Sequence, residues 1–128
     1  MQESANMTVR STILIADDCV SSVAILRCFL ESLGYNVFAV TDGEAAIEAI
    51  RRSKPAIALI DLTLPNLSGL EVARAIRADT NLSAVRLIAC TGLSGREHEE
   101  ASRRAGFESH LVKPAELFEI ERIIGRGD

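Results

Sequence analysis

Three aspartates in this chain stand directly after two strongly apolar segments. Residues 12–16 (TILIA) are followed by Asp17 and Asp18, and residues 56–60 (AIALI) are followed by Asp61. If these segments are neighbouring strands of a parallel sheet, their carboxyl ends meet at one edge and bring the carboxylates together. Like charges in one small volume are unfavourable unless a cation, protonation or modification relieves them. The pattern therefore predicts a divalent-metal site beside one reactive aspartate, Asp61.

Two further polar groups follow other apolar segments. Thr91 comes after residues 85–90, and Lys113 comes after residues 109–112. The chain contains two lysines and twelve arginines, so a lysine at this kind of position is notable. A compact ammonium can pair with a carboxylate or a phosphoryl oxygen as a point charge. Taken alone, Lys113 would be interpreted as a surface lysine. However, the aspartates, the threonine hydroxyl and the lysine ammonium each stand at the end of a predicted strand, which favours one shared site.

The rest of the chain alternates between strand-like and helix-like segments. Apolar runs predict five strands, at residues 12–16, 35–40, 56–60, 85–90 and 109–112. Apolar residues three or four positions apart, or Ser and Thr followed by Glu three positions later, predict helices at residues 19–33, 41–52, 68–78, 94–106 and 117–125. The helix at 94–106 lacks large apolar residues, so it is either a solvated charged element or a weakly anchored, movable one.

This alternation predicts an α/β fold of five βα units. Continuous apolar strands separated by amphipathic helices are typical of a doubly wound, five-stranded parallel sheet in three αβα layers. In the flavodoxin-like strand order 2-1-3-4-5, ligands bind beyond the carboxyl ends of the strands, where the order reverses. That point lies between the first and third strands, which are the two strands that end in aspartates.

Length and composition limit the function without naming it. The chain has 128 residues, 48% of them apolar, which suits one domain at 12–125, a flexible lead-in at 1–11 and a tail at 126–128. A net charge of -4 argues against direct nucleic-acid binding, and no apolar stretch reaches membrane-spanning length. Three cysteines without metal-ligand spacing suit a reducing compartment. We therefore expect a cytoplasmic protein with no nucleic-acid or membrane partner.

Taken in order, these motifs resemble the receiver domain of response regulators in two-component signalling. The resemblance covers nearly everything from residue 12 to residue 124. It rests on IADD at 15–18, IDLTLPNLSG at 60–69, CTG at 90–92, AGF at 105–107 and HLVKP at 110–114. It implies a phosphoacceptor signalling domain rather than an enzyme. Its partners would be a sensor histidine kinase or phosphotransfer protein, which supplies the phosphoryl group, and an output protein of unknown identity.

The resemblance also implies a role for each acidic residue. Asp61 would be the phosphoacceptor that attacks a phosphohistidine. Asp18 and Asp61 would bind Mg²⁺ directly, Asp17 would bind it through water, and Thr63 would bind it through its backbone carbonyl. Mg²⁺ prefers oxygen ligands and keeps several waters, which suits a few carboxylates and a phosphoryl group.

The remaining implied roles concern sensing of the phosphoryl group. Lys113 would pair with Asp61 or with a phosphoryl oxygen, and the peptide bond before Pro114 would be cis. Thr91 would bond the phosphoryl group, and His110 stands where the family usually has a Tyr or Phe that turns inward with this threonine. The face formed by residues 94–125 would then change and contact the output partner.

His110 departs from the family pattern in a way that affects switching. A histidine enters an apolar slot easily only as neutral imidazole. Because histidine titrates near neutral pH, we expect an inward ring to be disfavoured in mild acid. The sign reverses if a carboxylate or the phosphoryl group stabilises the cation. An exposed histidine at a strand edge is the alternative interpretation, but the position of His110 favours a role in switching.

Three other functions stay open at this point. A phosphatase of the haloacid-dehalogenase type also uses a strand-end aspartate with Mg²⁺. Such an enzyme usually has a second Asp two residues after the nucleophile, where this chain has Thr63. It also carries a cap domain, for which this sequence shows no segment. A nucleotide- or flavin-binding module would need a glycine-rich phosphate loop, and none of the usual motifs occurs. A pseudo-receiver that never takes phosphate is disfavoured by the complete set of site residues. The chain could be a stand-alone regulator or a receiver of a hybrid kinase, and residues 106–114 resemble receivers that are fused to kinases.

Overall fold

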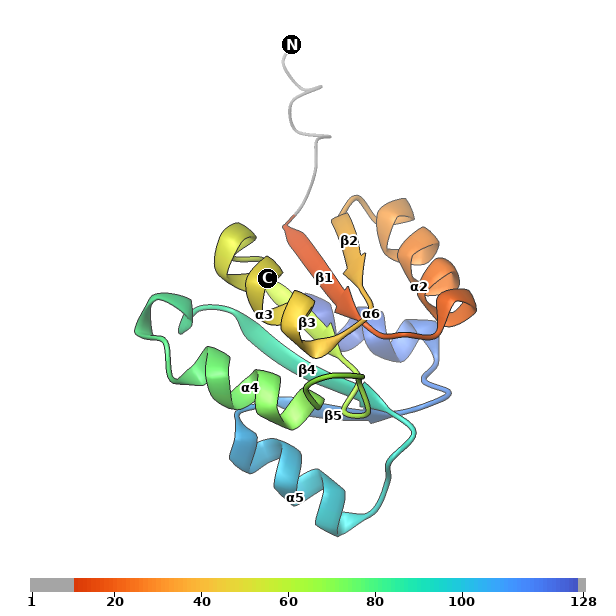
Figure 1. The fold of residues 1–128 in the computed structure, drawn as a ribbon. Coiled ribbons are helices and arrows are strands. Elements are labelled where there is room, and N and C mark those ends of the chain that lie inside the picture. The colour runs from red at the N-terminus through yellow and green to blue at the C-terminus, as the bar shows by residue number, and fades with distance from the viewer. Residues whose placement is uncertain (1–10, 127–128) are drawn as a thin grey trace.

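The computed structural model describes residues 11–126 and contains a five-stranded parallel sheet in the order β2-β1-β3-β4-β5 (Figure 1). The strands are β1 (Thr12–Ala16), β2 (Asn36–Val40), β3 (Ile57–Ile60), β4 (Arg86–Thr91) and β5 (Ser109–Val112). The helices are α2 (Val20–Ser32), α3 (Gly43–Ser53), α4 (Gly69–Arg77), α5 (Arg96–Ala105) and α6 (Leu117–Gly125), with a short 3-10 turn, η1 (Thr80–Leu82), before β4. The predicted doubly wound, flavodoxin-like α/β fold is confirmed. Most of the expected lead-in and tail lies outside the described residues.

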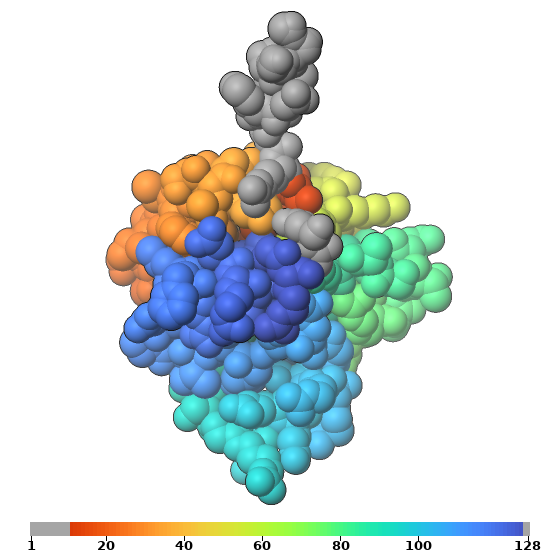
Figure 2. Space-filling model, turned by 180° about the vertical axis from the view of Figure 1, so that it is seen from behind, coloured from red at the N-terminus to blue at the C-terminus, as the bar shows by residue number. Residues whose placement is uncertain are grey.

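The helices cover both faces of the sheet because the strands are apolar on both sides. On one face, Leu14 and Ile60 pack with buried residues of α3, α4 and α5. On the other face, Ile13 and Ile15 pack with buried residues of α2 and α6. Seen from behind, α6 (blue) lies between α2 (orange) and α5 (cyan) (Figure 2). No helix within the described part of the chain has both the length and the apolarity to cross a bilayer.

The start of α4 shows how local sequence holds the end of β3 in place. The predicted capping box is confirmed: the Ser68 hydroxyl accepts from the Glu71 N–H at 3.2 Å, and the Glu71 carboxylate accepts from the Ser68 N–H at 3.0 Å. Gly69 then passes so close to β3 that an added Cβ would lie 2.5 Å from the Asp61 carbonyl oxygen. A residue without a side chain is therefore required beside Asp61.

The other two predicted capping boxes are wrong. α3 is capped by Asp42 rather than Thr41, because the Asp42 carboxylate accepts from the Ala45 N–H at 2.8 Å. α5 begins after Gly95, not Ser94, and no side chain caps it. Gly95 has a φ of 102°, a backbone conformation that favours glycine over residues with a Cβ. In both cases the helix starts one residue later than the Ser/Thr-Glu pattern predicts.

α5 is the helix with the smallest apolar contribution to the core. Its buried residues are Ser102 and Ala105, while the other helices bury larger side chains such as Leu30 and Ile76. At its C-terminal end, the Arg77 side chain donates to the Gly106 carbonyl oxygen at 3.4 Å. The expectation of limited apolar packing is confirmed, and this contact joins the end of α5 to α4.

Candidate functional site

The strand register places the predicted site residues at one edge of the sheet. Ala16 of β1 pairs with Ile60 of β3, so Asp17 and Asp61 follow directly opposite positions. Thr91 is the last residue of β4 and pairs with Val112, which places Lys113 just beyond it. Both aspartates and Thr91 are buried, as expected for polar groups held at the end of hydrophobic strands. The peptide bond between Lys113 and Pro114 is cis, as the family resemblance implied.

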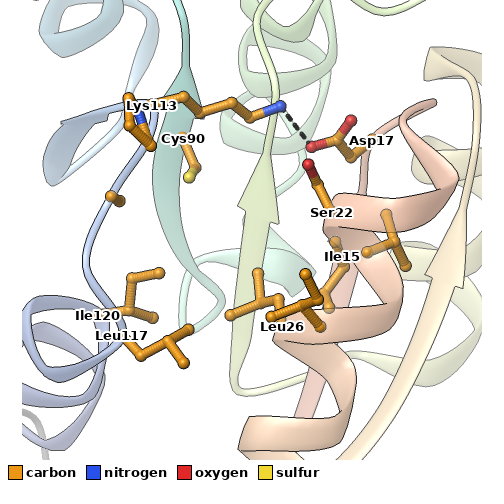
Figure 3. Close-up of a pocket in the computed structure, with 12 residues that line it drawn as sticks. Ile15, Asp17, Ser22, Leu26, Cys90, Lys113, Leu117 and Ile120 are labelled. Atoms are coloured by element: carbon orange, nitrogen blue, oxygen red, sulfur yellow. Dashed lines mark hydrogen bonds and ion pairs between the residues drawn. The ribbon is translucent and has the colours of Figure 1, made fainter.

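Lys113 lies between the two buried aspartates. Its Nζ donates to Asp17 Oδ2 at 2.6 Å and to Asp61 Oδ2 at 2.9 Å. The side chains of Asp17 and Asp61 are only 10% and 7% exposed. Figure 3 shows the Lys113 side chain reaching across the sheet edge toward Asp17. A single ammonium therefore compensates two carboxylates that would otherwise repel each other.

Asp61 is held as an ionised carboxylate. Its Oδ1 accepts from both the Thr63 N–H and the Thr63 hydroxyl, each at 3.0 Å. Burial raises the pKa of Asp61, but hydrogen bonds from Lys113, Thr63 and Thr91 and the charge of Lys113 outweigh it, so the pKa lies below its ordinary value. For Lys113, burial acts to lower the pKa, and the bonds to both aspartates raise it well above its usual range. At neutral pH both partners are charged.

One expectation about the acidic cluster is wrong. Asp18 is exposed whereas Asp17 and Asp61 are buried, so the three carboxylates do not share one enclosed volume as predicted. Among residues 11–126, no group of three or more His, Cys, Asp or Glu side chains lies at metal-binding spacing. The Lys113 ammonium holds both Asp17 and Asp61 by hydrogen bonds, whereas the Asp18 side chain is exposed.

The donor set nevertheless fits Mg²⁺. Two buried carboxylates converge on a position already occupied by positive charge, and Asp18, which follows Asp17 in the chain, adds an exposed carboxylate. These are hard oxygen donors of the kind that Mg²⁺ takes together with several waters. The backbone carbonyl of Thr63, two residues after Asp61, is a further oxygen donor of the same kind.

His110 is neither an exposed edge residue nor a ring in an apolar slot. It is half-buried, with Nδ1 2.9 Å from the Ser102 hydroxyl oxygen and Nε2 2.8 Å from the Leu93 carbonyl oxygen. Sequence reasoning missed both partners. The signal for one of them was present: Ser102 and Ala105, three positions apart, mark the buried side of α5, and a buried hydroxyl needs a polar partner.

A cavity of about 240 Å³ opens beside the site, between α2 and α6 (Figure 3). Asp17 and Lys113 border it, and Leu26 and Leu117 are among its apolar lining residues. The Cys90 thiol also lines it, and burial raises the pKa of this thiol to about 11. The thiol is therefore protonated at neutral pH and is a poor nucleophile. The sequence did not predict this cavity.

Comparison with known proteins points to one family. The family model described as response regulator receiver domain matches residues 13–125. The polar-differentiation response regulator DivK of Brucella anthropi is 30% identical over 103 residues, covering 80% of this chain and 84% of DivK. The DNA-binding response regulator MtrA of Mycobacterium tuberculosis is 37% identical over 119 residues, covering 93% of this chain. The chain spans 50% of the length of MtrA.

Solved structures show the same fold. The receiver domain of the sensor histidine kinase PA1611 from Pseudomonas aeruginosa is 34% identical with a TM-score of 0.84, covering 91% of this chain and 95% of that chain. That crystal structure contains a magnesium ion coordinated in the active site cleft. The chemotaxis protein CheY4 of Vibrio cholerae, 21% identical with a TM-score of 0.85 over 92% of this chain and 98% of its own, is similar in fold alone.

Proposed function

Because this chain belongs to the response regulator receiver domain family, we propose that it acts in a two-component phosphorelay with Asp61 as its phosphoacceptor. One observation carries the assignment to this residue. Asp61 is a buried, ionised carboxylate at the end of a central strand, hydrogen-bonded to a lysine that it shares with a second aspartate. Buried carboxylates whose pKa is shifted by a specific charge partner cluster at functional sites.

The proposed reaction moves one phosphoryl group. An Asp61 carboxylate oxygen attacks the phosphorus of a phosphohistidine, the new O–P bond forms, and the P–N bond breaks with its electron pair left on the imidazole of the donor. The Lys113 ammonium, already 2.9 Å from Asp61 Oδ2, neutralises the negative charge on the phosphoryl oxygens. The Thr91 hydroxyl lies at the same edge and can donate to a phosphoryl oxygen. Beyond its own phosphorylation and dephosphorylation, the domain needs no enzymatic activity.

Asp18 and Asp61 would hold Mg²⁺ directly in this proposal, with Asp17 through water and Thr63 through its backbone carbonyl. The ion would supply charge neutralisation for the attacking carboxylate and the phosphoryl oxygens. The oxygen donors at this edge support the assignment, as does the magnesium in the cleft of the Pseudomonas relative. The partners would be a histidine kinase or phosphotransfer protein and an output protein, all in the cytoplasm.

Intact mass spectrometry tests the proposed reaction. The full chain is incubated with acetyl phosphate, with and without Mg²⁺, and its mass is then measured. We expect one phosphoryl adduct that forms much faster with the metal. A chain that stays unmodified under both conditions would contradict the assignment and would favour a pseudo-receiver. The phosphatase alternative would need a second aspartate two residues after Asp61. That residue is Thr63, whose hydroxyl donates a hydrogen bond to Asp61.

Asp18→Asn should separate metal binding from stability. Because Asp18 is exposed and lies outside the Lys113 pair, its replacement should change the free energy of unfolding by no more than about 0.5 kcal/mol without metal. In the wild type, millimolar Mg²⁺ should raise the melting temperature, and the variant should lose most of this rise. Thermal melts of both proteins over a Mg²⁺ titration measure the effect. Equal responses in the two proteins would remove Asp18 from the proposed ligand set.

The face formed by α5, β5 and α6 is the proposed output surface. α5 has little apolar anchorage, and its neighbour His110 contacts the loop that follows Thr91. Hydrogen exchange with and without beryllofluoride, a phosphoryl mimic, should therefore change most between residues 92 and 113. Changes confined to the loops around Asp18 and Asp61 would contradict this model of switching.

A further inference from the structure

A continuous chain of hydrogen bonds joins Thr91 to α5. The Leu93 N–H donates to the Thr91 hydroxyl oxygen at 3.3 Å, and the Leu93 carbonyl oxygen lies 2.8 Å from His110 Nε2. On the other side of the ring, Nδ1 lies 2.9 Å from the Ser102 hydroxyl oxygen. The Ser102 hydroxyl is also 2.9 Å from the carbonyl oxygen of Glu99, which it can reach as a donor.

The number of protons decides how many of these bonds form. A carbonyl oxygen only accepts, so His110 Nε2 must carry a hydrogen to bond Leu93. In the neutral ring Nδ1 is then bare and accepts from the Ser102 hydroxyl, whose single hydrogen cannot also reach Glu99. In the imidazolium, Nδ1 carries a hydrogen and donates to the Ser102 oxygen, and the hydroxyl hydrogen is free for the Glu99 carbonyl. The protonated ring therefore completes three bonds, and the neutral ring completes two.

Ser102 is well placed to matter for α5. Ser102 is only 1% exposed, and the other buried residue of α5 is Ala105. Leaving a buried hydroxyl without a hydrogen-bond partner destabilises the folded state, whereas an exposed hydroxyl that loses its partner bonds to water instead. The bond to His110 therefore supplies a specific attachment between α5 and β5, and through Leu93 it reaches the loop that carries Thr91.

We propose that Ser102 is a positioning residue: it holds the His110 ring against the Leu93 carbonyl, and protonation of the ring tightens this clasp between α5 and the Thr91 loop. The clasp consists of Ser102, His110 and Leu93. The inference rests on the proposed role of Thr91 in sensing the phosphoryl group. It reverses the pH dependence expected from the sequence, because both ring nitrogens have oxygen partners instead of an apolar slot.

Other charged groups surround the clasp. On α5, the carboxylate of Glu99 and the imidazole of His98 are half-buried, three and four residues before Ser102. Lys113 follows β5 directly, and its ammonium is held by Asp17 and Asp61. The remaining ionisable side chains on α5, α4 and β4 are Arg96, Glu97, Glu100, Arg103 and Arg104 on α5, Glu71, Arg74 and Arg77 on α4, and Cys90 and Arg86 on β4. Arg86 pairs with Glu108.

Amide hydrogen exchange of α5 at two pH values tests the clasp in the unmodified full-length chain. Ser102→Ala removes the hydroxyl and little else. We expect it to lower the protection of residues 96–105 by about fivefold at pH 8, the effect of one neutral hydrogen bond. At pH 5.5 the loss should be roughly twentyfold, because a bond from an imidazolium is stronger. Comparing variant with wild type at each pH removes the intrinsic pH dependence of exchange.

Two controls make the result specific. Ser94→Ala changes an exposed serine just before α5 and should leave protection unchanged at both pH values. His110→Tyr replaces the titrating ring, so Ser102→Ala on that background should cost the same factor at pH 5.5 and pH 8. An equal loss at both pH values in the wild-type background, or no loss, would overturn the clasp and leave Ser102 as an ordinary buried serine.

The same variants separate this inference from the proposed function. Ser102→Ala should still form the phosphoryl adduct on Asp61, because the hydroxyl does not touch the acidic edge, but the α5 response to beryllofluoride should shrink. An undiminished response in Ser102→Ala would overturn the positioning role while leaving phosphorylation intact. If no protein takes the adduct, the proposed function fails, and the exchange comparison in unmodified protein still decides whether the clasp exists.

Discussion

Asp61→Asn should abolish the phosphoryl adduct that the wild-type chain forms with acetyl phosphate and Mg²⁺. The amide oxygen is a much weaker nucleophile than a carboxylate, and the substitution also removes the negative charge that pairs with Lys113. The fold should persist, because Lys113 keeps its bond to Asp17 and the Thr63 N–H can still donate to the amide oxygen. Intact mass spectrometry measures the loss, and far-UV circular dichroism checks the fold.

Asp42→Asn is the matched control. Asp42 is also an aspartate that accepts a backbone N–H, but it caps α3, and asparagine caps a helix about as well. This variant should form the adduct at the wild-type level. An adduct that survives in Asp61→Asn would move the phosphoacceptor to Asp17 or Asp18, and peptide mapping of the modified chain would show which of them carries it.

Lys113→Ala should destabilise the domain by about 3 kcal/mol at neutral pH. The lysine side chain is 26% exposed and its two partners are less so, hence removal leaves Asp17 and Asp61 facing each other without a compensating charge. Chemical denaturation of wild type and variant gives the difference in the free energy of unfolding. Lys54→Ala is the control: the only other lysine is exposed, and its loss should cost no more than about 0.5 kcal/mol.

The pH dependence gives this prediction a sign. The pKa of Asp61 is lowered in the folded state, so its contribution to stability is present above its unfolded pKa, about 3.9, and is lost as pH falls through the folded value. The pKa of Lys113 is raised, so its contribution is present below about 10.4 and is lost only as pH rises through the folded value. The gap between wild type and Lys113→Ala should be widest between about pH 5 and pH 10 and should narrow in acid. A gap that stays constant down to pH 3 would show that Lys113 acts through packing rather than charge.

Some features of this molecule could be read directly from the amino-acid order. The apolar runs and the helical spacing predict the five strands and five helices within a few residues, because both depend on periodicities only a few residues long. Right-handed crossovers and short connections then leave few strand orders, and the flavodoxin-like order expected among them is the one observed. Once the order is known, Asp17, Asp61, Thr91 and Lys113 must share one edge, and the register of β1 with β3 places them there.

Other features needed the tertiary structure, because they depend on which side chains meet across elements far apart in the chain. Lys113 lies between Asp17 and Asp61, which are 96 and 52 residues away in the chain. Asp18 is exposed, although all three aspartates follow apolar strands in the same way. His110 likewise bonds Ser102 and Leu93 on other elements. Such pairings depend on side-chain directions and distances of a few ångströms, which hydrophobic periodicity does not encode. The sequence thus determined which groups gather at the sheet edge, and the packed structure decided which of them pair.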